Sequence, residues 1–475
     1  MSRKIKKPLP ILNNVHIEGI AAEGQSIAHE EGKVLFVPFG APEDICTVQI
    51  VKKKKHFSEG RIIALEKPSP HRIDPICTHF GTCGGCKWQH IPYSMQLEAK
   101  ETQVIDALAR LGGVSVEKQL PILGADHVFR YRNKVEFTFS NRRWMTSEEM
   151  QLSNGEGYEK GFGFHIPGRF DKVLDLHECH LATETTNRIR DAIRELTISE
   201  TSQYSYFDLR EQNGMMRTAM VRSNAKGDIM LLLAFAEDDE ESRNKLLSTL
   251  VTRFPEIKSL VWVINTKAND TFADLEVHCF HGNDYIMEQL GDLNFKIGAK
   301  SFFQTNTAQA LKLYNVVKDF ATLQSSDVVY DLYTGTGTIA NYVARECSKV
   351  IGIEYVPEAV EDAKENSHIN GITNTLFFAG DMKDILQSDF LEEHGTPDVI
   401  ITDPPRAGMH PDVIKTILAA QPRKIVYVSC NPATQARDAA LLVAGNYRIL
   451  RSQPVDMFPQ THHVENVLLL TRDEK

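Results

Sequence analysis

The stretch Asp331-Leu-Tyr-Thr-Gly-Thr-Gly-Thr-Ile-Ala340 decides how the C-terminal part of this 475-residue chain folds. Its apolar lead-in predicts a strand, and the glycines at 335 and 337 predict a tight turn into a helix, where backbone approaches a ligand closely. Glu354 ends the next predicted strand, where a carboxylate can hold two ribose hydroxyls. This Gly-x-Gly-x-x-Ala spacing suits a nicotinamide dinucleotide and S-adenosylmethionine equally well.

Further apolar runs surround this turn. Predicted strands, separated by helical segments such as residues 357–369, lie at residues 328–331, 350–354, 399–403, 425–429 and 467–471. Continuous apolar strands that alternate with helices predict an α/β fold with a buried, parallel, doubly wound sheet. Ligands of such Rossmann-like sheets bind at the carboxyl ends of the strands.

Two motifs at these strand ends favour methyl transfer to a base. Asp403-Pro-Pro-Arg406 resembles the site of many S-adenosylmethionine-dependent methyltransferases, which decides against nicotinamide. Ser429-Cys430-Asn431-Pro432 ends the following strand. Cys430 by type could be a buried structural cysteine. Its position suits covalent catalysis, because carbon 5 of uracil becomes nucleophilic only after a thiolate has added to carbon 6.

Two more stretches supply candidate polar groups. Glu465, in His462-His-Val-Glu-Asn466, can remove the proton from carbon 5 after methylation, although by type it could be a solvated loop carboxylate. His462 or His463 could equally supply or relay that proton. Gln304, in Ser301-Phe-Phe-Gln-Thr-Asn306, can donate to and accept from a ligand, or it can simply pack among aromatic side chains.

A cysteine cluster lies earlier in the chain. Cys77, Cys83 and Cys86 fall within ten residues, and Cys179 lies in His177-Glu-Cys-His180. Four thiolates suit either zinc or an iron–sulfur cluster. Zinc ribbons usually use two Cys-x2-Cys pairs, and only one is present here, which favours iron–sulfur.

Composition and charge narrow the class of protein. At about 150 residues per domain the length predicts several domains. The net charge of −10 argues against binding nucleic acid through bulk charge, so such a surface must be local. Residues 10–65 contain short β-rich runs separated by Gly and Pro, a pattern that is typical of a small β-barrel. The basic run at 52–56 and the basic residues at 3–7 indicate either solvated loops or contact with a phosphate backbone.

The short apolar runs and the low number of cysteines indicate the cellular compartment of the protein. The apolar run at residues 9–12 is too short for a signal peptide, and the run at 229–236 is too short to span a bilayer. Eight cysteines are too few for a disulfide scaffold in a chain of this length. We therefore expect a soluble, cytoplasmic protein with no membrane partner.

Taken together, these motifs resemble the RNA 5-methyluridine methyltransferase family, and the Cys-x5-Cys-x2-Cys spacing resembles its iron–sulfur-containing 23S ribosomal RNA members. The resemblance implies an N-terminal TRAM domain, an OB-like RNA-binding β-barrel, at residues 10–66. It also implies a mixed α+β iron–sulfur domain at 67–290 and a Rossmann-like class I methyltransferase domain at 291–475. Tyr333-Thr334 stands where Phe-Cys is more usual in the family, and Thr338 where Asn is.

The resemblance also assigns roles. It implies Cys430 as nucleophile and Glu465 as base, S-adenosylmethionine contacts at Gln304, Tyr333, Glu354 and Asp403, and a 4Fe-4S cluster, with zinc as the alternative, on Cys77, Cys83, Cys86 and Cys179.

The expected reaction is methylation of uracil carbon 5 in RNA. We expect the substrate to be a specific uridine of 23S rRNA, free or in a pre-ribosomal particle, and the enzyme to be a monomer. Three alternatives stay open: a tRNA uracil-5-methyltransferase, an exocyclic-amine methyltransferase that forms no covalent adduct, and a non-catalytic rRNA-binding assembly factor.

Overall fold

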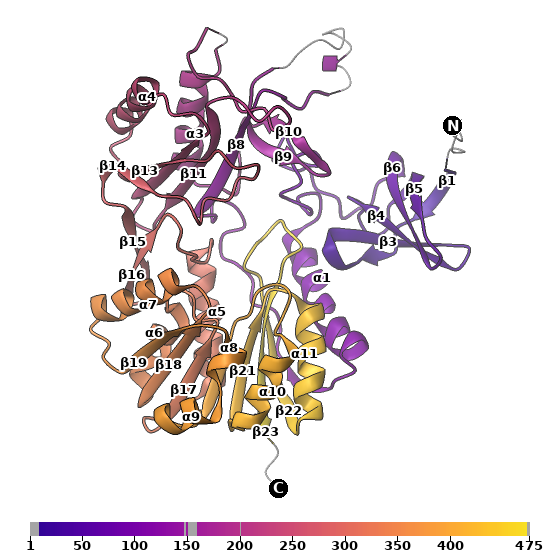
Figure 1. The fold of residues 1–475 in the computed structure, drawn as a ribbon. Helices are drawn as coiled ribbons and strands as arrows, with labels where there is room; N and C mark the ends of the chain where they lie inside the picture. Colours follow the sequence, from indigo (N-terminus) through magenta and orange to yellow (C-terminus); the bar gives the residue numbers. More distant parts are fainter. Residues whose placement is uncertain (1–8, 147–148, 151–158, 200, 473–475) are drawn as a thin grey trace, which may run out of the picture.

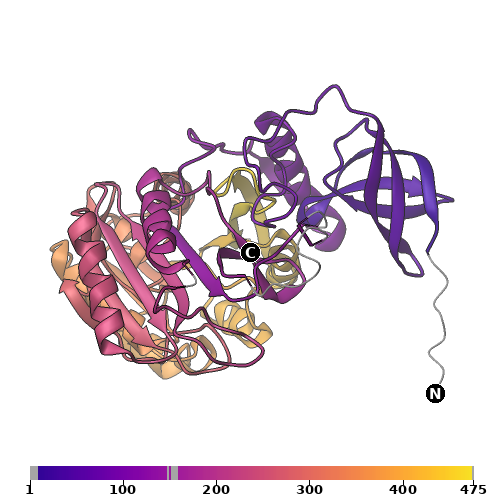
Figure 2. The same cartoon turned by 90° about the horizontal axis from the view of Figure 1, so that it is seen from above.

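A computed structural model describes residues 9–146, 149–150, 159–199 and 201–472 of the chain. These residues form three parts (Figure 1): an N-terminal barrel, a central α+β part and a C-terminal α/β part. Viewed from above (Figure 2), the barrel projects from one side of the molecule beside helix α1 (Tyr93–Asp106). The basic residues 3–7 singled out above lie outside the described ranges.

The N-terminal part is a curled six-stranded sheet in the order β1-β5-β6-β4-β3-β2. Alternating apolar side chains, such as Leu35 and Val37, fill its interior, while the intervening positions face outward. The strands β1 and β3 lie against each other where the barrel closes. Its strands are β1 (Ile11–His16), β2 (Gly19–Ile20), β3 (Gln25–Glu30), β4 (Lys33–Pro38), β5 (Ile45–Lys53) and β6 (Phe57–Lys67).

The central part is a seven-stranded sheet in the order β10-β9-β8-β11-β12-β13-β14, with a hairpin of β15 and β16 after it. Helices α3 (Glu184–Thr197) and α4 (Glu240–Arg253) pack on this sheet. The strands are β8 (Lys134–Ser140), β9 (Gly161–Ile166), β10 (Arg169–Asp175), β11 (Met216–Ser223), β12 (Ile229–Phe235), β13 (Ile257–Ile264), β14 (His278–Gly282), β15 (Tyr285–Leu290) and β16 (Leu293–Gly298).

The C-terminal part is an eight-stranded sheet in the order β19-β18-β17-β20-β21-β23-β22-β7. The five strands predicted above are all present, and β17 to β21 run parallel. The strands are β17 (Val328–Leu332), β18 (Lys349–Glu354), β19 (Thr375–Ala379), β20 (Val399–Thr402), β21 (Lys424–Ser429), β22 (Tyr447–Val455) and β23 (Glu465–Arg472).

The prediction of an all-parallel sheet is wrong for β23, which pairs antiparallel with both β21 and β22. The physical reason is the connection: only a loop, residues 456–464, separates β22 from β23, and a parallel neighbour would need a crossover of a dozen or more residues.

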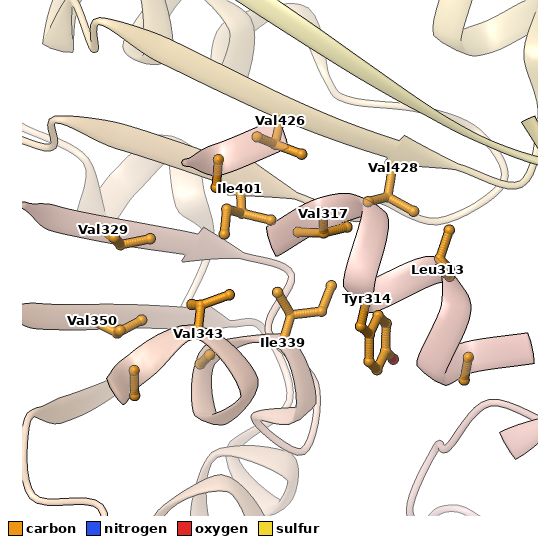
Figure 3. Packing of buried hydrophobic residues seen from close by; sticks show 14 of the residues in the cluster. Leu313, Tyr314, Val317, Val329, Ile339, Val343, Val350, Ile401, Val426 and Val428 are labelled. Atoms are coloured by element: carbon orange, nitrogen blue, oxygen red, sulfur yellow. The ribbon is translucent and has the colours of Figure 1, made fainter. Parts of the chain in front are cut away.

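Helices cover both faces of this sheet, so that its strands are buried on both sides. One face carries α5 (Thr307–Ala321), α6 (Thr338–Val343) and α7 (Pro357–Ile369). Figure 3 shows this packing, with Leu313, Val317, Ile339 and Val343 against the strand residues Val329, Ile401 and Val426. The other face carries α8 (Met382–Ile385), α10 (Pro411–Ala420) and α11 (Pro432–Ala444), and α9 (Ser388–His394) lies at its margin.

A segment from before the central sheet also belongs to this second face. Helix α1 is followed by a π-helical turn, Ala107–Leu111, which packs against α11. Strand β7 (Val116–Gln119) then pairs parallel with β22 at the sheet edge. Within the described residues, no helix combines the length and apolar character that a bilayer span requires.

Candidate active site

The glycine turn predicted from the sequence links β17 to α6. Asp331 fixes it, because one carboxyl oxygen accepts from the Thr334 hydroxyl at 2.6 Å and from the Ala340 backbone N–H at 3.0 Å. Gly337 has φ 76°, and a Cβ there would lie 2.9 Å from Ala363, so only glycine fits. Around Gly335 there is open space, where a ligand can approach the backbone.

Glu354 ends β18 beside this turn. Its carboxylate accepts hydrogen bonds from the backbone N–H groups of Gly335 and Val356, both at 3.0 Å. The carboxylate therefore stands at the open side of the turn, where the sequence predicted a ribose partner. Tyr355, the next residue, is 69% exposed and presents a bare aromatic ring there. Tyr333 begins the turn in a left-handed conformation, φ 63°.

Three carboxyl groups, Asp331, Asp403 and Glu465, lie together next to the turn. Burial raises the pKa of Asp331 to about 7, and burial together with Asp331 raises the pKa of Asp403 to about 7. Burial, followed by repulsion from Asp403, holds the pKa of Glu465 well above its usual range. The second carboxyl oxygen of Asp331 is buried without a partner. Such a site lacks a positive charge, and the sulfonium of S-adenosylmethionine fits that need.

Cys430 and Glu465 face each other across two strands. Ser429, the last residue of β21, pairs with Asn466 of the antiparallel β23, so the next positions outward are Cys430 and Glu465. A parallel β23 would have placed Glu465 at the opposite edge of the sheet. Burial raises the pKa of the Cys430 thiol to about 11, and the Glu465 and Asp403 carboxylates contribute.

Loop 456–464, which precedes Glu465, is anchored by α1. Lys100 and Asp456 form an ion pair at 2.5 Å with both side chains fully buried, and Lys100 also donates to the Phe458 carbonyl. The Tyr93 hydroxyl donates to the other Asp456 oxygen at 2.8 Å. The Gln96 side chain donates a hydrogen bond to the Gln460 side chain, and it accepts one from the Gln460 backbone N–H.

The two histidines of this loop, His462 and His463, precede Glu465 in the sequence by three and two residues. The centres of their imidazole rings are 4.1 Å apart. Burial lowers the pKa of each to about 4; Arg406 adds to this at His462, and the neighbouring His462 adds to it at His463. Both imidazoles are therefore neutral at pH 7. The Nδ1 atom of His462 is buried without a partner.

Gln304 lies in a loop held by both neighbouring parts of the molecule. Its backbone carbonyl accepts from the Asn133 side chain at 3.1 Å, and the next carbonyl, of Thr305, accepts from the Asn133 backbone. Asn306 caps α5 and donates to the Met457 carbonyl at 2.9 Å. The loop thus joins the central sheet to loop 456–464. Beside the buried Gln304, Phe302 is 70% exposed.

The four predicted cysteine ligands line one cavity of about 470 Å³ in the central part: Cys77, Cys83, Cys86 and Cys179. Burial raises the pKa of Cys86 to about 12, and the other three thiols add to this, so the four groups interact. Across the described ranges, no set of three or more His, Cys, Asp or Glu side chains is arranged to hold a single metal ion.

The sequence interpretation missed the residues that hold the site together. Lys100 and Asp456 are 356 positions apart and carry no local signal for each other. Asp456 does lie only six residues before His462, and a buried acid in that stretch could have been suspected from its apolar neighbours Val455 and Met457.

Comparisons with known proteins place this geometry in a family. Residues 278–473 match the family described as tRNA (Uracil-5-)-methyltransferase, and residues 13–63 match the TRAM domain. Proteins named as uncharacterized RNA methyltransferases are similar over almost the whole chain. The one from Porphyromonas gingivalis is 59% identical across 97% of this chain and 100% of its own length. The one from Bacteroides thetaiotaomicron is 51% identical across 95% and 99%.

A solved structure is similar throughout. The tRNA (uracil-54, C5)-methyltransferase of Pyrococcus abyssi, in complex with S-adenosyl-L-homocysteine, has a TM-score of 0.74 and 27% identity, over 97% of this chain and 100% of its own. With the glycine turn, the carboxyl cluster and the N-terminal barrel in place, the chain belongs to the RNA 5-methyluridine methyltransferase family, S-adenosylmethionine-dependent enzymes here carrying an N-terminal TRAM domain.

Proposed function

We propose that this enzyme methylates carbon 5 of a specific uridine in 23S rRNA through a covalent adduct between Cys430 and carbon 6. The observation that carries the proposal is the register of β21 and β23, which sets Cys430 opposite Glu465. A nucleophile and a base at one edge of the sheet are what methylation of pyrimidine carbon 5 requires.

The reaction divides between these two side chains. The Cys430 sulfur adds to carbon 6, and the electron pair displaced from the 5,6 double bond makes carbon 5 nucleophilic. Bound S-adenosylmethionine supplies a methyl group on a positively charged sulfur. Once carbon 5 carries that methyl group, Glu465 removes the proton from the same carbon. The electrons of that C–H bond restore the double bond and expel the thiolate, so the enzyme is regenerated.

Charge explains how the thiol is activated. In the free protein, burial and two carboxylates favour the protonated thiol, with a pKa of about 11. A cation bound among Asp331, Asp403 and Glu465 offsets those carboxylates and lowers the thiol pKa. We assign the cofactor contacts to Gln304, Tyr333, Glu354 and Asp403. Glu354 supports this assignment, because it accepts a hydrogen bond from the Gly335 N–H of the turn.

The target uridine must leave its stack, because a stacked uracil presents neither face to an attacking sulfur. We therefore propose a single-stranded or loop segment as the substrate, bound by a monomeric enzyme. The neutral His462 and His463 can relay the proton that Glu465 removes.

The shared cavity supports a cluster proposal. We propose that Cys77, Cys83, Cys86 and Cys179 hold a 4Fe-4S cluster with a structural role, since the two-electron chemistry above requires no redox step. Brown protein with absorbance near roughly 400 nm and iron in the metal analysis is the expected result. Stoichiometric zinc in place of iron would decide for the alternative.

One observation favours a second substrate. The solved structure that is similar over its full length is named as a tRNA (uracil-54, C5)-methyltransferase. The experiment is transfer of tritiated methyl groups from S-adenosylmethionine to 23S rRNA and to bulk tRNA from cells lacking this enzyme. Label in 23S rRNA, mapped to one uridine by mass spectrometry, supports the proposal. Label in tRNA alone overturns the rRNA assignment, and label that survives Cys430→Ala overturns the covalent mechanism.

A further inference from the structure

Three positively charged side chains act on the histidines of loop 456–464, His462 and His463. We call Lys87, Arg132 and Arg406 the cationic rim. Nowhere in the described chain does any of them have a carboxylate at ion-pair distance, whereas their neighbour Lys134 is paired with Glu136 at 2.8 Å. The rim stands out in a protein whose net charge is −10.

Lys87 is fixed against the loop by its backbone and its side-chain stem. Its N–H donates to the Gln460 carbonyl at 2.8 Å. A Cβ built on Gly24 of the barrel would lie 3.0 Å from the Lys87 stem and 3.4 Å from His462, so these three residues adjoin. The ammonium group lies 5.8 Å from the ring centre of Phe39.

Arg132 belongs to the central part, where it lines the cavity of the four cysteines, next to a residue that bonds the loop. The neighbouring Tyr131 hydroxyl donates to the Pro459 carbonyl of the loop at 2.9 Å. The Arg132 Nε donates to the Lys134 carbonyl at 3.0 Å, which holds the side chain without neutralising it. Arg132 is also among the charges that lower the pKa of His463.

Arg406 approaches from the side of the nucleophile. Its carbonyl accepts from the Asn431 side chain at 3.1 Å and from the Thr434 hydroxyl at 3.2 Å, which ties it to the turn after Cys430. Its positive charge lowers the pKa of both histidines. Lys87, Arg132 and Arg406 therefore bring positive charge to loop 456–464 and its two histidines.

Clustered cations without counter-charge repel one another, so the fold bears a cost that a bound anion would remove. The substrate class supplies that anion. We propose that the cationic rim binds the RNA phosphodiester groups flanking the target uridine and thereby holds the extruded base over Cys430. This inference rests on the proposed function and adds a subsite to it, with Lys87 and Arg132 as residues that no motif had singled out.

The test measures how RNA binding depends on salt. A fluorescent oligouridylate carrying one 5-fluorouridine is titrated with the full-length enzyme in the presence of S-adenosylhomocysteine. Each lost phosphate contact on single-stranded RNA lowers the slope of log K against log salt by about 0.7. We expect that decrease for Lys87→Gln, about twice as much for Lys87→Gln with Arg132→Gln, and the wild-type slope for Lys87→Arg.

Lys364→Gln is the matched control, because Lys364 is an exposed α7 lysine paired with Glu361 away from the rim. Unchanged melting temperature and S-adenosylhomocysteine affinity show that each variant is folded. A wild-type slope in the double variant, or an equal decrease in Lys364→Gln, overturns the rim as a phosphate site. Absence of methyl transfer by the wild type to any RNA would instead overturn the proposed function, so the two failures are distinguishable.

Discussion

Glu465 shows how one residue depends on the direction of its strand. It is 4% exposed at the start of β23, opposite Cys430 at the end of β21. Its neighbours are Asp403 and apolar strand residues, so its pKa is held well above the usual range. A carboxyl group with a raised pKa is a stronger base once it has been ionised, which suits removal of a proton from carbon.

Replacing Glu465 by Gln should separate the two halves of the reaction. Without the base, the adduct forms and is methylated, but carbon 5 keeps its proton, so the thiolate cannot leave. We expect multiple turnover to fall by about 10²–10⁴-fold. A covalent RNA–enzyme complex carrying the tritiated methyl group should accumulate on unsubstituted RNA, seen on a denaturing gel.

Cys430→Ala should give no such complex, which makes it the control. Free methylated RNA released by Glu465→Gln at the wild-type rate would show that another group, such as His463, is the base.

The Asp403 carboxylate should lower the free energy of unfolding of the protein when no cofactor is bound. Its pKa is about 7 in the folded protein against 3.8 in the unfolded chain, so the folded state binds more protons between these values. Stability of the free protein therefore falls as pH rises from about 4 to 7. Asp403→Asn should remove part of that dependence and raise the free energy of unfolding at pH 8 by about 1 kcal/mol.

Urea unfolding at pH 5 and pH 8 measures this effect. Asp403→Asn should also lose S-adenosylmethionine binding, measured by calorimetry. Asp412→Asn, on an exposed carboxylate of α10, is the control and should leave the pH dependence as it is. A variant less stable than the wild type at pH 8 would show that the Asp403 carboxylate stabilises the free fold.

At the scale of elements, local pattern predicted the strands but not their partners. The glycine turn and the apolar runs around it fixed β17, β18, β20, β21 and β23, because each signal is carried by adjacent residues. The direction of β23 depends on the length of loop 456–464. The pairing of β7 with β22 joins residues more than 300 positions apart, and no periodicity encodes that. The motifs of the sequence nominate the candidate site residues, whereas the contacts that hold them carry no local signal.

The ion pair between α1 and loop 456–464 should be essential to this packing. Lys100→Met leaves Asp456 buried and unpaired, which costs about 3–5 kcal/mol of unfolding free energy. Lys100→Met combined with Asp456→Asn should recover part of the loss, because the charge is gone. Chemical denaturation measures both variants.

Arg110→Met is the control, just after the same helix. The Arg110 side chain is 77% exposed and pairs with Asp106. Removing this exposed pair should lower the free energy of unfolding by less than about 1 kcal/mol. If Lys100→Met and Arg110→Met cost the same, the buried pair does not hold the loop.

In the whole molecule, all three parts meet at loop 456–464. The central part reaches it through Tyr131, the C-terminal part carries it, and the barrel touches it through Gly24. Figure 1 shows this loop rising from the C-terminal sheet toward the other two parts. The family resemblance predicted the barrel as an RNA-binding unit. Its contact with the loop that carries His462 depends on tertiary packing, of which the sequence gives no sign.

The contact predicts that the barrel influences catalysis as well as RNA binding. Gly24 and Gly32 lie in the same barrel with φ 74° and 75°, so Gly→Ala imposes the same backbone strain at either position, about 1 kcal/mol. They differ in surroundings: a Cβ at Gly24 meets Lys87 and His462, whereas a Cβ at Gly32 meets nothing within 4 Å. Gly24→Ala should therefore displace the loop, and because small misplacements of reacting groups are costly, kcat should fall by about tenfold or more. Gly32→Ala should lower the melting temperature similarly and keep the wild-type kcat, measured by methyl transfer at saturating RNA. Equal kcat values for the two variants would mean that the barrel only tethers the substrate.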